Sequence, residues 1–217
     1  MKKNIKKIII IIIVAIVISI ITILSIQIKE SKRNKPVEKP IIYLYPEKEE
    51  KISVNLDYNG KLTHIYPKFS KENEWTITAK PDGTIIKDNK EYYALFWEGE
   101  DNFNYKIDKG FCIKGEDTAQ FLEEKLEILG LNQKEINEFI IYWLPKMENN
   151  NYNVISFQTN DYTNNAKLNI NPKPDTLIRV FMTWYPSKNT VEISKQNLIK
   201  TTRTGFTVVE WGGSKIK

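Results

Sequence analysis

The feature that most constrains this chain is an apolar run near its start, from Ile8 to Ile28. Its 21 residues carry no charge and are interrupted only by two serines, one threonine and one glutamine. As an α-helix the run would extend about 31 Å, and a hydrocarbon core is about 30 Å thick. The run therefore predicts a transmembrane helix, with a lipid bilayer as the partner of Ile8 to Ile28.

The same run also resembles the apolar part of a cleaved signal peptide. A signal peptide has an apolar core of about 7–15 residues followed by a small-x-small site, and this run is longer and ends in Gln27-Ile28-Lys29. The single cysteine, Cys112, lies too far along the chain for a lipoprotein. We therefore expect an uncleaved signal anchor. Basic residues flank both ends, so the short amino-terminal flank decides the orientation: a cytosolic amino terminus and an extracytoplasmic remainder at the cell membrane.

Charge is distributed unevenly along the chain. The formal net charge is +5, but residues 1–40 carry +7, so residues 41–217 carry −2. The basic residues near the apolar run influence topology and attract anionic lipid headgroups. A nucleic-acid-binding domain needs a basic face of its own, so we expect no nucleic-acid partner.

Composition divides the chain into three parts. Residues 1–28 hold the cytosolic tip and the anchor, and residues 29–40 form a polar stalk, because they are charged and contain two prolines. Residues 41–217 are numerous enough for one domain with a substantial core. One cysteine excludes a disulfide within this domain.

Alternation of apolar and polar residues predicts strands at the start of this domain. From Ile52 to Tyr58 every second residue is apolar, which gives the strand one apolar face. Asn59-Gly60 follows and favours a type I′ turn, so we expect a hairpin with Lys61–Tyr66. His64 would then lie on the polar face, as a surface residue rather than a catalytic one.

Helices are predicted in the middle of the chain. Asp117 and Asn132 are each followed three residues later by Gln or Glu, which is a capping-box pattern, and apolar residues then recur at helical spacing. Gly130 separates the two helices. Strands return in the last third, over 154–158, 166–170, 177–184 and 206–211.

Two of these last strands carry a charge on an apolar face. Arg179 shares its face with Phe181, and Glu210 shares its face with Phe206 and Val208. An unpaired buried charge is costly. We therefore expect a structural ion pair between Arg179 and Glu210, or a separate partner for each.

Together these patterns predict an α+β fold. A single N-terminal transmembrane helix would be followed by one extracytoplasmic domain of antiparallel β-strands, with a central pair of helices packed on a sheet face.

Four segments in one order resemble an uncharacterised bacterial family of exported or membrane-anchored proteins: KPIIYLYPE, LFWEG, NEFIIYWLP and GFTVVEWGG. The resemblance extends from about Lys39 to Gly213. No activity is known for that family, so the resemblance implies no catalytic residue. It implies that the domain is a single unit and that the anchor is a separable addition.

The first functional hypothesis is a non-enzymatic binding module at the cell envelope. Large aromatic side chains can stack on a polysaccharide, a peptide or an envelope protein. The same side chains can equally be core residues, because large aromatics are usually buried. The candidate binding residues are Tyr45, Trp97, Trp143, Trp184 and Trp211.

The second hypothesis is a hydrolase of envelope polysaccharide with Glu98, Glu138 and Glu210 as candidate catalytic acids, which would require two carboxyl groups about 5–9.5 Å apart. The third is a structural or assembly component of the envelope. Buried tryptophans would favour the third, and an exposed aromatic cluster beside a carboxylate would favour binding or catalysis. We expect binding rather than catalysis.

Other classes of chemistry have little support in the sequence. There is no G-x-S-x-G motif for a serine nucleophile and no glycine-rich phosphate loop. One histidine and one cysteine are too few for a zinc site. We therefore expect neither a cofactor nor a metal.

Overall fold

The computed structural model of the chain describes residues 15–23, 25, 35–101, 103–158 and 160–216. The chain divides into two compact units, Met1–Asn34 and Lys35–Lys217. The second unit therefore begins within the segment that the sequence analysis assigned to a stalk.

The apolar run belongs to the first unit. Residues 15–23 and 25 are helical, but a helix needs about 20 residues to cross a hydrocarbon core. No helix among the described residues is long and apolar enough to do so. This finding contradicts the prediction of a single-pass transmembrane helix over Ile8–Ile28, which is corrected accordingly. The other positions of that run lie outside the described residues. The predicted location at the cell membrane rested on this helix and stays a prediction.

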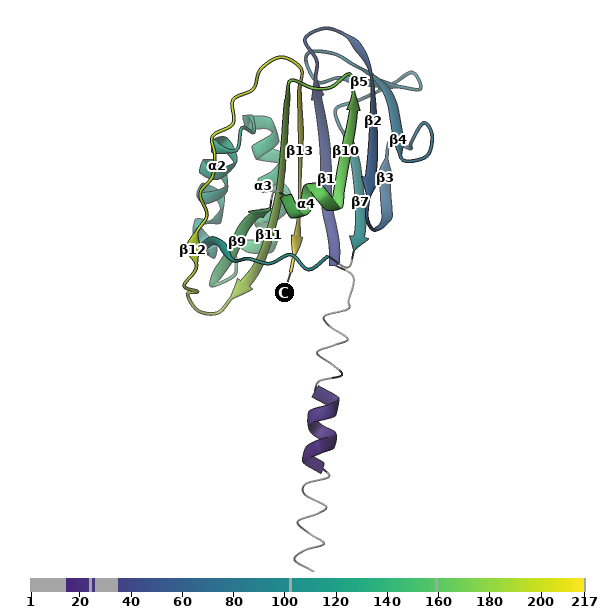
Figure 1. Cartoon of the computed structure of the whole chain (residues 1–217). Coiled ribbons are helices and arrows are strands. Elements are labelled where there is room, and N and C mark those ends of the chain that lie inside the picture. The colour runs from purple at the N-terminus through teal and green to yellow at the C-terminus, as the bar shows by residue number, and fades with distance from the viewer. Residues whose placement is uncertain (1–14, 24, 26–34, 102, 159, 217) are drawn as a thin grey trace, which may run out of the picture. The chain divides into compact units, whose positions relative to one another are not determined.

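The second unit consists mostly of β-strands arranged in two sheets (Figure 1). The larger sheet has eight strands, in the spatial order β12 (Ser194–Lys195), β8 (Lys109–Lys114), β9 (Tyr152–Gln158), β11 (Thr176–Ser187), β13 (Thr207–Lys215), β1 (Lys35–Tyr45), β7 (Leu95–Asp101) and β3 (Lys61–Tyr66). The smaller sheet has five strands, in the order β10 (Ala166–Asn171), β2 (Glu50–Tyr58), β4 (Glu74–Ala79), β5 (Ile85–Lys87) and β6 (Lys90–Tyr92).

The eight-stranded sheet is mixed in direction. β1 runs antiparallel to both of its neighbours, β13 and β7, whereas β11 runs parallel to β13. A parallel pair needs a long crossover connection, and the chain between β11 and β13 supplies one that carries β12 to the far edge of the sheet. The first and last strands of the unit, β1 and β13, pair with each other in the middle of the larger sheet.

Two hydrophobic cores lie on opposite faces of the eight-stranded sheet. Alternate residues of β1 point to opposite faces, so Ile42 and Leu44 enter one core while Ile41 and Tyr43 enter the other. The first core fills the space between the two sheets. Its residues from the smaller sheet include Ile52, Val54, Leu56, Trp75, Ile77 and Ile85.

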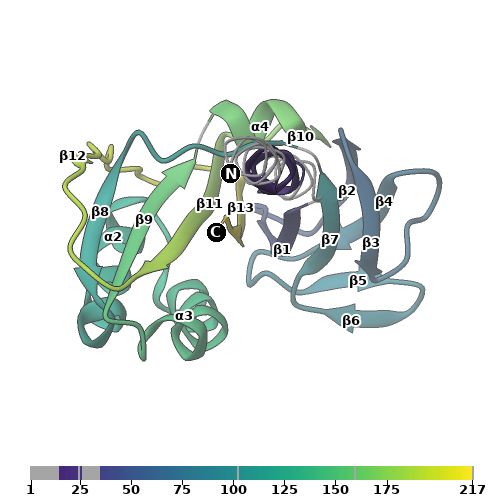
Figure 2. The same ribbon diagram turned by 90° about the horizontal axis from the view of Figure 1, so that it is seen from below.

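Helices cover part of the opposite face. Figure 2 shows α2 (Thr118–Ile128) and α3 (Gln133–Met147) on one side of β9 and β11, with the short α4 (Asn160–Asn165) on the other side. A short 3₁₀ helix, Gly115–Asp117, precedes α2. The helices bury Leu122, Leu126, Ile136, Phe139, Trp143 and Met147 in the second core.

The expected α+β class was wrong in its main feature, since this unit is a two-sheet structure that is mostly strand. The predicted hairpin shows why. β2 pairs with β4 and β10 in the smaller sheet, whereas β3 pairs with β7 in the larger one. Asn59-Gly60 therefore carries the chain from one sheet to the other. Alternation identified the apolar face of each strand, but it contains no information about which strand lies next to it.

Candidate functional site

The tryptophans proposed for ligand binding lie inside the protein. All four, Trp97, Trp143, Trp184 and Trp211, are at most 1% exposed. The indole N–H of Trp97 donates to Glu210 Oε1 at 3.1 Å, and that of Trp211 donates to the Tyr43 hydroxyl at 3.2 Å. None of these rings can therefore stack on a polymer at the surface.

Arg179 and Glu210 lie directly opposite each other on neighbouring strands β11 and β13. The Arg179 guanidinium donates from Nε to Glu210 Oε2 at 2.7 Å, and the side chains are 7% and 0% exposed. Glu210 is therefore part of a buried ion pair and has no access to a polysaccharide. Tyr162 of α4 lies against the guanidinium, which is 4.9 Å from the centre of its ring.

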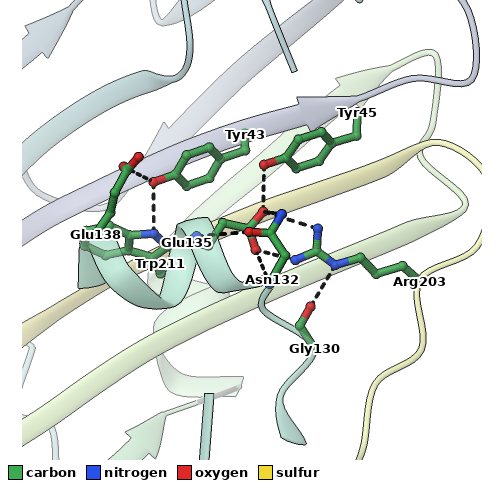
Figure 3. Close-up of polar contacts among 8 residues, drawn as sticks. All are labelled: Tyr43, Tyr45, Gly130, Asn132, Glu135, Glu138, Arg203 and Trp211. Atoms are coloured by element: carbon green, nitrogen blue, oxygen red, sulfur yellow. Dashed lines mark hydrogen bonds and ion pairs between the residues drawn. The ribbon is translucent and has the colours of Figure 1, made fainter. Parts of the chain in front are cut away.

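A polar cluster joins β1 to the start of α3 (Figure 3). The Tyr43 hydroxyl donates to Glu138 Oε2 at 2.6 Å, and the Tyr45 hydroxyl donates to Glu135 Oε1 at 2.8 Å. The two tyrosine rings stack with centroids 6.4 Å apart. Two of the sequence candidates, Tyr45 and Glu138, therefore belong to one cluster, although they do not contact each other directly.

Glu135 holds the cluster together and was not among the sequence candidates. Its side chain is 0% exposed, accepts from the backbone N–H of Asn132 in a capping box, and forms an ion pair with Arg203. Arg203 also donates to the carbonyl oxygen of Gly130 at 2.7 Å. The capping pattern placed Glu135 at a helix start, but no local signal linked it to Arg203. Because every polar group of Glu135 has a partner, we assign the cluster a structural role.

Burial and neighbouring carboxylates raise the pKa of both cluster tyrosines. Desolvation is the largest cause for Tyr43, followed by its hydrogen bond to Glu138, and the pKa of this phenol lies well above its usual range. Desolvation also raises the pKa of Tyr45, with the negative charge of Glu135 as the next cause. Both hydroxyls therefore remain protonated donors.

A groove of about 490 Å³ lies beside this cluster, on the face of β1, β7 and β3 that the sandwich core does not occupy. It is lined by Lys39, Ile41, Tyr66, Glu91, Tyr92, Tyr93, Ala94 and Phe96. Directly opposed residues of neighbouring strands share a face, and the pairings Tyr66 with Phe96 and Phe96 with Ile41 place these three in one row across the sheet.

The groove presents exposed aromatic rings. Tyr66 is 62% exposed and Tyr93 is 53% exposed, and Tyr92 meets Tyr66 edge-on with ring centroids 5.6 Å apart. Tyr93 also lies 6.5 Å from the ring of Tyr43, which connects the groove to the polar cluster. The exposed aromatic rings therefore belong to tyrosines that were not among the candidate binding residues, which were Tyr45 and four tryptophans.

Lys39 enters the groove from an irregular part of β1. The pairing of β1 shifts register between Val37 and Ile41, and Lys39 has a positive φ of 61°. Its backbone N–H donates to Glu98 Oε1 at 3.1 Å. Its ammonium lies 5.4 Å from the ring centre of Phe96 and 5.5 Å from that of Tyr142.

Of the three candidate catalytic acids, Glu98 lies beside the groove. It is opposite His64 on β3, and the His64 Nδ1 lies 3.3 Å from Glu98 Oε2. The histidine side chain is 69% exposed. Glu98 thus supports the irregular backbone at Lys39. The other two acids are elsewhere: Glu138 accepts a hydrogen bond from the Tyr43 hydroxyl, and Glu210 lies on the opposite face of the sheet. Within the described parts of the chain, no group of three or more His, Cys, Asp or Glu residues is arranged to hold a metal ion.

Comparisons with known proteins give one uncharacterised relative. No family model matches the chain, and no solved structure matches it. A protein of Butyrivibrio fibrisolvens, described as "Uncharacterized protein in bglA 3'region", is 48% identical over 63 residues. The match covers 29% of this chain and 66% of that protein, just under two thirds of its length.

Proposed function

We propose that the unit Lys35–Lys217 is a non-enzymatic binding module whose aromatic groove receives an oligosaccharide. The observation that supports this most directly is the pair of exposed tyrosines, Tyr66 and Tyr93, on the wall of a single groove. Its volume of about 490 Å³ lies within the range of small-ligand sites, about 300–1,000 Å³.

The chemistry of the groove suits a sugar chain. The C–H faces of a sugar ring pack on aromatic rings, and its hydroxyls need polar partners at the edges. Tyr66, Tyr93 and Phe96 supply rings, while Lys39 and Glu91 supply a donor and an acceptor at the groove wall. Tyrosine is well suited to such a surface because it has an apolar body and a polar tip.

Binding is favoured over hydrolysis by the bonds that the candidate acids already make. Glu98 accepts from the backbone of Lys39, and Glu138 accepts from Tyr43 at 2.6 Å. Glu210 is paired with Arg179 in the interior. Each carboxylate therefore has a structural partner.

The proposal is tested by calorimetric titration of the full chain with neutral and acidic oligosaccharides. We expect Tyr66→Ala and Tyr93→Ala each to weaken binding about three- to tenfold, since one aromatic contact contributes about 0.5–1.5 kcal/mol. Ile199→Ala is the matched control, because Ile199 is apolar, 78% exposed and absent from the groove wall.

The same mixtures are assayed for new reducing ends, and we expect none. Cleavage that is lost in Glu98→Gln would contradict a purely binding role and favour a hydrolase. Failure of every oligosaccharide to bind would refute the proposal and leave a structural role for the unit.

A further inference from the structure

The carboxylates around the groove already have partners. Glu91 lies 3.6 Å from Lys80, and Glu98 is held by His64 and the Lys39 backbone. Glu138 accepts from Tyr43. Glu98 and Glu138 are therefore engaged by groups of the protein itself, whereas Glu91, whose side chain is 71% exposed, still offers an acceptor.

One lysine on the groove wall and one beside it have no such carboxylate partner in the part of the chain that the structure describes. Lys39 lines the groove, and Lys134 lies with its ammonium 5.0 Å from the ring centre of Tyr93, another lining residue. Among the described residues, neither ammonium has a carboxylate within 4.0 Å. Lys146 shows the contrast, because it lies nearby on Tyr142 but is ion-paired with Glu38.

The aromatic rings position these two cations without neutralising them. A lysine ammonium over a ring gains about 0.5–1 kcal/mol at an exposed site. The ring occupies one side of the ammonium, and its N–H donors remain available on the other sides. Lys39 and Lys134 therefore provide positive charge beside the rings that are proposed to hold the sugar.

The backbone at Lys39 gives a second, independent reason to assign this residue a role. A positive φ is uncommon for a residue with a side chain and costs free energy. Irregularities of this kind redirect side chains, and they are over-represented at sheet edges, at barrel rims and next to active sites. Here the Glu98 carboxylate holds the irregular turn of backbone in place at 3.1 Å, and the Lys39 side chain enters the groove.

We propose that the ligand of the groove is an acidic oligosaccharide, whose carboxylate groups are bound by Lys39 and Lys134. This inference rests on the proposed function, because it specifies the charge of a ligand that the aromatic rings would bind. Each lysine would donate a charge-assisted hydrogen bond to a carboxylate oxygen of the sugar.

The test uses two probes with the same sugar chain, one with free carboxylates and one with methyl-esterified, uncharged carboxyl groups. Oligogalacturonides and their fully methyl-esterified counterparts are titrated into the full chain in a calorimeter. We expect the acid form to bind at least about tenfold more tightly, the equivalent of one charge-assisted hydrogen bond, and to weaken with added salt.

Variants assign the effect to the groove. Lys39→Gln should lose most of the difference between acid and ester, and Lys39→Arg should keep it. Lys200→Gln is the control, because Lys200 is exposed and lies outside the groove wall. The unfolding temperature of each variant is measured alongside, so that a loss of fold is not counted as a loss of binding.

The outcomes separate the two proposals. Equal binding of acid and ester would overturn the inference and leave the oligosaccharide groove intact. No binding of either probe or of neutral oligosaccharides would overturn both. Equally tight binding of an oligoglutamate peptide would overturn the choice of a sugar and favour an acidic peptide.

Discussion

At the scale of single residues, the interior of the sandwich contains a buried charge pair. Arg179 and Glu210 are 7% and 0% exposed, and Trp97 donates to the same carboxylate. Desolvation is the largest single influence and lowers the pKa of Arg179, but the charge and hydrogen bond of Glu210 together with the contacts of Tyr162 outweigh it, so the pKa of the guanidinium is raised. The arginine therefore stays charged in the folded protein.

We expect Arg179→Met to lower the free energy of unfolding by about 3–5 kcal/mol, because it leaves the Glu210 carboxylate buried and unpaired. The double variant with Glu210→Met should be less destabilised than Arg179→Met alone, since no uncompensated charge remains. Urea unfolding monitored by circular dichroism gives both values. Additive losses in the double variant would contradict the coupling of the two charges.

Individual residues differed in how far the sequence could define them. Alternation placed Arg179 and Glu210 on apolar faces, and the cost of burying a lone charge pointed to the pair. The exposed tyrosines of the groove were not identified, because a tyrosine in an apolar run has the same local signature whether it is buried like Tyr43 or exposed like Tyr93. Which one is covered depends on where α3 ends its contact with the sheet, which is a property of the folded chain.

At the scale of elements, the start of α3 is a junction of three segments. Asn132 caps the helix, Glu135 completes the capping box, and Arg203 from the chain before β13 pairs with that same glutamate. The Tyr45 hydroxyl adds a bond from the end of β1. The local capping pattern therefore also fixes two segments that are distant in sequence.

We expect Asn132→Ala to cost about 1 kcal/mol of stability through the lost cap. Glu135→Ala should cost about 1.5–3 kcal/mol, because it also removes hydrogen bonds to the charged Arg203. Gln133→Ala at the exposed first position is the control and should stay within about 0.5 kcal/mol. Thermal unfolding of the three variants decides this, and equal losses for Asn132→Ala and Glu135→Ala would show that only the cap matters.

The hairpin between β2 and β3 marks the limit of prediction for elements. Asn59-Gly60 is a strong local turn signal, and both strands have an apolar face, so a hairpin satisfied every rule available from the sequence. The long-range pairing of β3 with β7 decided otherwise. At the junction, a Cβ added to Gly60 would meet the Tyr58 ring at 2.5 Å. Close packing against Tyr58 therefore explains this glycine, whereas the sequence analysis explained it by a turn conformation.

At the scale of the whole molecule, the folded protein keeps many of its phenols protonated. Burial raises the pKa above the ordinary value of 10.0 for seven of the eleven tyrosines: Tyr43, Tyr45, Tyr58, Tyr93, Tyr105, Tyr142 and Tyr162. Above pH 10 the unfolded chain therefore binds fewer protons than the folded one. By linkage, stability is retained below pH 10 and falls as the pH rises above it.

We expect the urea midpoint to decrease steadily above pH 10, and the ultraviolet absorbance of phenolate to rise in two stages. The accessible tyrosines should titrate first, and the buried ones only as the fold is lost. Circular dichroism recorded in the same titration identifies the second stage. Titration of all the tyrosines together near pH 10, with the circular dichroism signal unchanged, would contradict this expectation.

The position of β13 between two cores limits which insertions and deletions this strand can accept during evolution. Val208 and Glu210 face the sandwich core and its arginine, whereas Val209 and Trp211 face the helices. Inserting or deleting one residue here would exchange the two sets, sending the glutamate among the helices and the tryptophan between the sheets. Insertions and deletions in this strand can therefore be tolerated only in pairs.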